Sequence, residues 1–93
     1  MPLNNHEPVV YYLSSPEFSK VVKIGTTVNL DSRLKRMKRL KPDWDLHYLA
    51  SEPGNETTEK QRMATFQHLR IAGDWFYLCD ELEAHVATLG GAK

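Results

Sequence analysis

The sequence predicts a small α+β domain in which a three-stranded antiparallel sheet is flanked by helices. Two observations predict this class. Short runs of β-branched and aromatic residues have the composition of strands, and they alternate with longer segments whose apolar residues recur at helical spacing. A length of 93 residues suits one domain, which we expect to span residues 1–93 with a core at about 9–89.

Three short runs have the composition of strands: residues 9–13 (VVYYL), 20–24 (KVVKI) and 46–50 (LHYLA). A polar loop separates the first two runs, which predicts a β-hairpin, and Gly25 closes the second run. Residues 73–78 (GDWFYL) are expected to form an extended surface segment anchored by Trp75 and Phe76.

Three segments are predicted to be helical. Asn29 can cap a helix from Leu30, whose apolar residues recur at helical spacing until Pro42 ends it. A second helix is expected over about 56–69, and Asp80 is expected to cap a third that ends at Leu89.

The formal net charge of zero hides a strong asymmetry along the chain. Residues 20–41 hold eight Lys or Arg against one acid, whereas residues 43–93 hold four against nine. A concentrated basic segment indicates a polyanionic partner. The alternative is a helix face that is simply solvated.

No apolar run has the length of a membrane span, and the first residues lack the pattern of a secretory signal. We therefore expect a soluble, cytoplasmic protein with no membrane partner. Cys79 is the only cysteine in the sequence, which excludes an internal disulfide, and we expect a buried, inert thiol. The four histidines have no ligand-like spacing, so structural roles are expected for them.

The ordered pattern resembles the GIY-YIG endonuclease superfamily, and within it the small phage and fungal DNA-binding domains that carry KIG in place of YIG. Val9-Val10-Tyr11 is similar to the first element, and Lys23-Ile24-Gly25 to the second. The segment from Asn29 to Leu34 is similar to N-x-x-x-R-L, and residues 66–76 (FQHLRIAGDWF) to F-x-x-L-R-x-x-G-D/E-W-F. The resemblance covers residues 9 to about 82. The chain departs from the pattern at Met37 and Met63, where relatives often carry polar residues or His, and the superfamily's late asparagine has no clear counterpart.

The resemblance implies four catalytic residues. Tyr11 is the expected base, which nearby cations would help to ionise, and Lys23 and Arg33 are the expected electrostatic stabilisers of the phosphate. Glu59 is the expected ligand of one Mg²⁺ or Mn²⁺ ion. Each residue also has a simpler interpretation: a packed sheet tyrosine, a solvated edge lysine, one more helix cation, and a carboxylate in a helix's first turn.

The function predicted from these residues is a small, divalent-metal-dependent DNA endonuclease that hydrolyses phosphodiester bonds. We expect double-stranded DNA as the partner. Gly25 would let a phosphate approach the strand end closely, and the following helix would track the backbone. The expected backbone contacts are Lys35, Arg36, Lys38, Arg39 and Lys41.

Two rival functions remain open at this stage. One is a non-catalytic DNA-binding module of the same fold, and the other is a protein-interaction domain whose basic helix docks on an acidic partner. Because no separate DNA-recognition domain is evident in the sequence, we expect low sequence specificity, action as a homodimer, or binding without cleavage.

Overall fold

The computed structural model describes residues 7–14, 20–40 and 47–90. In chain order the elements are β1 (Val9–Ser14), β2 (Val21–Thr27), α1 (Leu30–Leu40), β3 (His47–Pro53), α2 (Glu56–Thr65), β4 (Arg70–Ala72), β5 (Trp75–Tyr77) and α3 (Asp80–Gly90). A 3₁₀ turn at Gln67–Leu69 joins α2 to β4. Residues 15–19 of the loop between the first two predicted strands lie outside the described residues, as do Pro42, the expected helix stop, and part of the third predicted strand.

The five strands form one antiparallel sheet in the order β3-β1-β2-β5-β4. The predicted α+β class with an antiparallel sheet is therefore confirmed, and so is the hairpin between β1 and β2. The predicted count of three strands was too low. The two additional strands, β4 and β5, have three residues each, and so short a run carries no readable alternation of polar and apolar residues.

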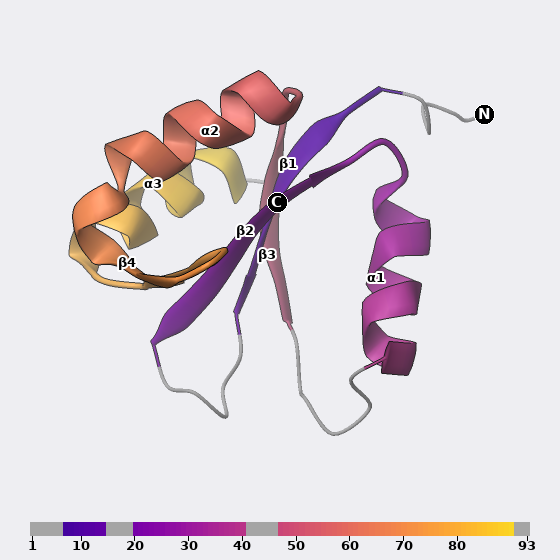
Figure 1. Cartoon of the computed structure of the whole chain (residues 1–93), viewed down its shortest axis with the longest axis horizontal. Helices are drawn as coiled ribbons and strands as arrows, with labels where there is room; N and C mark the ends of the chain where they lie inside the picture. The colour runs from indigo at the N-terminus through magenta and orange to yellow at the C-terminus, as the bar shows by residue number, and fades with distance from the viewer. Residues whose placement is uncertain (1–6, 15–19, 41–46, 91–93) are drawn as a thin grey trace.

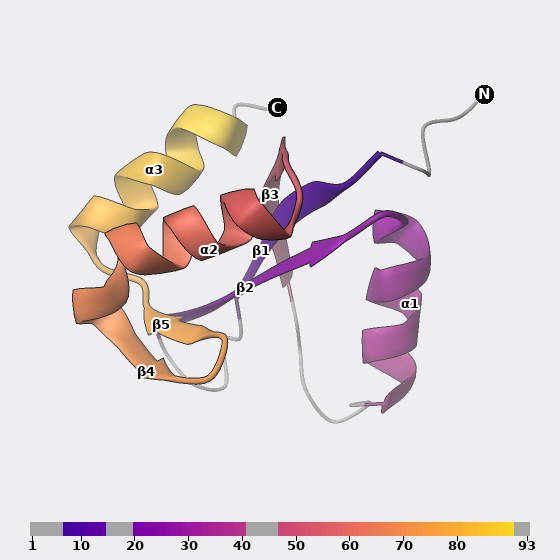
Figure 2. The same cartoon turned by 45° about the horizontal axis from the view of Figure 1, so that its top comes forward.

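The pairing of β1 with β2 determines which residues share a face of the sheet, because directly opposed residues in an antiparallel pair point to the same side. Tyr12 opposes Ile24, and both lie in the hydrophobic core. Helices α2 and α3 cover this face, whereas α1 lies on the other side of the sheet (Figures 1 and 2). The buried residues of the core cluster are Val10, Tyr12, Val22, Ile24, Phe66, Phe76 and Leu82.

A buried polar network links the core face to the helices. The Tyr12 hydroxyl donates to Glu52 Oε2 at 2.6 Å, and Arg62 donates to both Glu52 oxygens at 2.9 and 2.8 Å. His85 Nε2 lies 3.0 Å from the Tyr12 oxygen. Since the phenol proton points at Glu52, His85 Nε2 must carry the hydrogen of that contact. The network ties β1 and β3 to α2 and α3.

The network strongly favours the ionised form of Glu52. The bidentate bond from Arg62 outweighs burial and lowers the pKa of Glu52 to about 2. Burial and the adjacent carboxylate raise the pKa of Tyr12, so the phenol remains protonated. His85 takes part in this network through its contact with the Tyr12 hydroxyl. No sequence pattern indicated the Glu52–Arg62 pair, because its members lie on separate elements.

Helix α1 is attached to the sheet less tightly than α2 and α3. None of its residues is fully buried, although Leu30, Leu34 and Met37 are half-buried, and Leu40 is 65% exposed. The predicted cap is confirmed: Ser32 N–H donates to Asn29 Oδ1 at 3.0 Å, and Asn29 N–H donates to Thr27 Oγ1 at 3.1 Å. These bonds fix the start of α1 relative to the end of β2.

Candidate functional site

Tyr11 lies on the face of the sheet opposite the α2–α3 core, and it is 1% exposed. It opposes Gly25 across the hairpin. A Cβ atom placed on Gly25 would lie 2.5 Å from both Cζ and Oη of Tyr11, so the ring or the backbone would have to shift. The structure thus assigns Gly25 a different role from the one expected: the Tyr11 ring, and not a phosphate, fills the space above the glycine.

Arg33 reaches the Tyr11 hydroxyl from the first turn of α1. Its Nη1 donates to the phenol oxygen at 3.5 Å, a distance at the long end for a hydrogen bond. The guanidinium reaches this position because the Asn29 cap fixes the helix start and Arg33 N–H donates to the Asn29 carbonyl at 3.0 Å. Two residues that are 22 positions apart in the sequence thus meet at one atom.

Lys23 shares the face of Tyr11, since it opposes Leu13 on β1 and Trp75 on β5. Its side chain is only 19% exposed, and its Nζ lies 2.9 Å from Asp74 Oδ2. The interpretation of Lys23 as a solvated edge residue is therefore wrong. The aspartate that binds it was part of the motif at residues 66–76, but sequence reasoning gave it no role.

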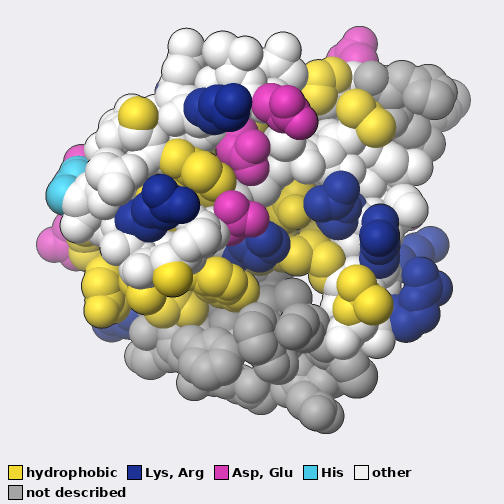
Figure 3. Space-filling view, in the orientation of Figure 1, with side chains coloured by type: hydrophobic (Ala, Val, Ile, Leu, Met, Phe, Trp, Pro, Cys, Tyr) yellow, Lys and Arg dark blue, Asp and Glu magenta, His cyan; other side chains and the backbone are white. Residues whose placement is uncertain are grey.

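Glu59 is half-buried in the first turn of α2, three residues before Arg62 of the buried network. Burial raises its pKa above the ordinary value, as do the negative charges of Asp74 and Glu56, while Lys23 and Lys60 lower it. The charges of both members of the Lys23–Asp74 pair thus act on the Glu59 carboxylate. Figure 3 shows acidic side chains gathered with a cation at the centre of this face of the molecule.

The four predicted catalytic residues fall into two adjoining pairs in the structure. Tyr11 and Arg33 are joined by a hydrogen bond, and the positive charge of Lys23 lowers the pKa of Glu59. Tyr11 and Lys23 share one face of the β1–β2 hairpin. Their catalytic roles remain predictions. We call these four residues with Asp74 the candidate site.

The basic helix presents its remaining cations to solvent. Lys35, Arg36, Lys38 and Arg39 are all exposed on α1. The described contact of Lys35 is a loose, exposed pair with Asp31 at 3.8 Å, so its charge stays available to a partner. Figure 3 shows blue side chains over α1 on the same face as the central acids. The fifth predicted contact, Lys41, lies outside the described residues.

The described residues contain no group of three His, Cys, Asp or Glu side chains that could hold a metal ion. A divalent ion at the candidate site would therefore take Glu59 and complete its shell with water and phosphate oxygens, an arrangement that Mg²⁺ accepts. The chemistry of Glu59 fits this, because its carboxylate is partly desolvated and has acidic neighbours, so a cation would relieve its unfavourable charge.

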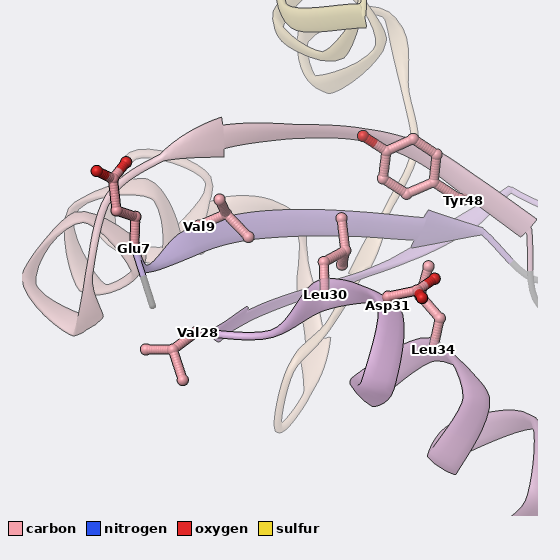
Figure 4. Close-up of a pocket in the computed structure, with 7 residues that line it drawn as sticks. All are labelled: Glu7, Val9, Val28, Leu30, Asp31, Leu34 and Tyr48. Carbon is pink, nitrogen blue, oxygen red and sulfur yellow. The ribbon is translucent and has the colours of Figure 1, made fainter. Parts of the chain in front are cut away.

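Other features lie apart from the candidate site. An open hollow of about 380 Å³ lies between α1, the start of β1 and Tyr48 of β3, and it contains none of the candidate residues (Figure 4). Met63 packs on the hydrophobic core, and Phe76 is fully buried as expected. The expectation of a buried Cys79 was wrong: the residue is exposed directly before α3, where its carbonyl accepts from Glu83 N–H at 2.8 Å.

Among the described residues, no helix combines the length and apolar character needed to cross a bilayer. No curated protein and no solved structure matches the chain. Residues 8–88 match the T5orf172 domain, a phage-associated domain, and this range includes every residue of the candidate site. The match supports a phage-type domain that is nuclease-like or binds DNA. Because the match spans most of the sequence, the chain belongs to the T5orf172 domain family.

Proposed function

We propose that this protein is a small, divalent-metal-dependent DNA endonuclease of the GIY-YIG type. The observation that carries the proposal is the contact between Arg33 and the Tyr11 hydroxyl, on the face of the sheet that also carries Lys23. The Tyr11 ring packs over Gly25, and its hydroxyl lies beside a guanidinium. This arrangement suits proton transfer next to a bound phosphate.

Phosphodiester hydrolysis needs a base for the attacking water and positive charge around the phosphate. Tyr11 would accept the proton of the water. Arg33 would donate to non-bridging phosphate oxygens through its planar fork, and Lys23 would add a second positive charge. A divalent ion held by Glu59 would polarise a phosphate oxygen and stabilise the leaving oxygen.

The exposed cations of α1 would bind the DNA backbone on either side of the cut. Lys35, Arg36, Lys38 and Arg39 give one helix four solvent-facing charges within five residues. Contacts of this kind fix the position of the protein on DNA without reading its sequence, so affinity should fall steeply with salt. Double-stranded DNA is the proposed substrate, and a homodimer would allow cuts in both strands.

A specific observation also favours a second function, that of a DNA-binding module without catalysis. The charge of Lys23 is neutralised by Asp74. Among the described residues, Glu59 belongs to no group of three potential metal ligands. The basic face of α1 would act alone in such a module. It would bind DNA with the same salt dependence, but it would leave the strands intact.

The test incubates the protein with supercoiled plasmid in Mg²⁺ or Mn²⁺ and compares it with Glu59→Gln and with an EDTA control. Glu83→Gln, which removes an equal charge from an exposed position on α3, is the matched control variant. We expect nicking by the wild type and by Glu83→Gln, and none by Glu59→Gln or in EDTA. If no protein nicks the plasmid while gel shifts show DNA binding by all three, the non-catalytic module is the correct function.

A further inference from the structure

Asp74 is fixed in place by its backbone, independently of its side chain. It lies in the turn between β4 and β5, directly after Gly73, whose φ of +54° lies in the left-handed region that favours glycine. The Asp74 carbonyl accepts from Ile24 N–H on β2 at 3.0 Å. The turn is thus docked beside the part of β2 that carries Lys23.

The Asp74 carboxylate provides the partner that Lys23 requires. The Lys23 side chain is largely buried between residues of β1 and β5, and an ammonium in such a position is costly without an opposite charge. Asp74 Oδ2 lies 2.9 Å from Lys23 Nζ, while the Asp74 side chain remains 48% exposed. The pair therefore lies at the boundary between the sheet and solvent, where a bound phosphate could also reach the ammonium.

We propose that Asp74 is a positioning residue of the candidate site, holding the Lys23 ammonium on the face of the sheet that carries Tyr11. This inference rests on the proposed function. A free lysine side chain has a flexible stem of four carbons, and ordering it when substrate binds would cost entropy. The ion pair orders it beforehand, which is the kind of contribution that lowers a reaction barrier without tightening substrate binding.

The charges of the site give the inference a distinctive signature. The cations Lys23 and Arg33 balance the carboxylates of Glu59 and Asp74 in the candidate site, and the Asp74 carboxylate repels a phosphate even while it positions the lysine. Removal of the carboxylate should therefore tighten DNA binding and slow cleavage at the same time. A variant that was merely damaged in its folding would lose both properties.

The experiment compares Asp74→Ala and Asp74→Asn with wild type and with Glu83→Gln. It measures cleavage rates at saturating DNA, and DNA affinity in EDTA.

We expect the rate of Asp74→Ala to fall about 100-fold, the size of effect that misplacement of a catalytic group produces. Asp74→Asn should fall less, because its amide oxygen still accepts from Lys23. Both should bind DNA at least as tightly as wild type. A rate for Asp74→Ala equal to that of Glu83→Gln, or weaker DNA binding by the folded Asp74→Asn variant, would overturn the proposal.

A second measurement does not depend on cleavage. In an NMR spectrum of ¹⁵N-labelled protein, a lysine ammonium held in an ion pair gives an observable resonance. The resonance of Lys23 is the one that is missing from the spectrum of the Lys23→Arg variant. We expect this resonance in wild type and its loss in Asp74→Ala. If wild type cuts no DNA, the proposed function fails, yet this spectrum still decides whether Asp74 positions Lys23. An unchanged ammonium resonance in Asp74→Ala would overturn the inference.

Discussion

Tyr11 and Tyr12 are neighbours on β1, and their hydroxyls point to opposite faces of the sheet. The Tyr11 hydroxyl accepts from Arg33 of α1, whereas the Tyr12 hydroxyl donates to Glu52 of the buried network. Because side chains alternate along a strand, one dipeptide serves both the candidate site and the core. The network behind Tyr12 also fixes α2, the helix that carries Glu59.

This division predicts opposite phenotypes for two conservative substitutions. Tyr11→Phe should abolish plasmid nicking and leave the melting temperature almost unchanged, since the bond that it removes is long. Tyr12→Phe should retain nicking but lose about 1–2 kcal/mol of stability, because Glu52 loses a buried hydrogen bond. Thermal melts followed by circular dichroism, together with the nicking assay, check both variants. Loss of nicking only in Tyr12→Phe would contradict the assignment of Tyr11.

Gly25 should be intolerant of even the smallest side chain. The added methyl group of Gly25→Ala would lie 2.5 Å from the Tyr11 ring, so the ring must move or the hairpin must bend. Overpacking of this kind costs about 1–3 kcal/mol. The double variant Gly25→Ala with Tyr11→Ala should lose less stability than the sum of the losses of the two single variants, because the clash is absent once the ring is removed. Urea unfolding of the single and double variants measures this coupling, and strictly additive losses would contradict the proposed clash.

The buried network should make the protein sensitive to strong acid. Arg62 holds the pKa of Glu52 at about 2, below the value of 4.5 expected for the unfolded chain. The stability from this carboxylate is therefore fully present above pH of about 4.5 and is lost as the pH falls through about 2. The loss is on the order of 3 kcal/mol. Denaturant unfolding between neutral pH and this acid range should show it.

Glu52→Gln is the control for the acid prediction. It keeps the shape of the side chain but cannot titrate, so its stability should start lower and vary less between pH of about 4.5 and about 2. If wild type and Glu52→Gln lose stability in parallel over this range, other carboxylates cause the acid sensitivity.

The parts of the site that could be predicted from sequence are those that depend on residues close together in the chain. The hairpin, the Asn29 cap and the placement of Arg33 one turn into α1 follow from residue types at short spacing. The ion pair of Lys23 with Asp74 could not be predicted in this way, because it depends on β5 pairing with β2. That pairing joins segments some 50 residues apart through strands too short to show a pattern. No local signal revealed that α2 is tied to β3 through Arg62 and Glu52 either, because the two residues lie on separate elements.

Glu59 should show a trade-off between stability and function. Burial and the nearby charges of Asp74 and Glu56 raise its pKa, so the folded state binds the proton more tightly than the unfolded chain does. Its ionised form therefore costs stability at neutral pH, and that cost disappears as the pH falls through the raised pKa. Glu59→Gln should then stabilise the metal-free protein slightly, because the carboxylate is only partly solvated, while abolishing nicking. Addition of Mg²⁺ should raise the melting temperature of wild type but not that of Glu59→Gln, because binding to the folded state alone is stabilising. Exposed Glu83→Gln should match wild type in both measurements. An equal response of wild type and Glu59→Gln to Mg²⁺ would place the ion elsewhere.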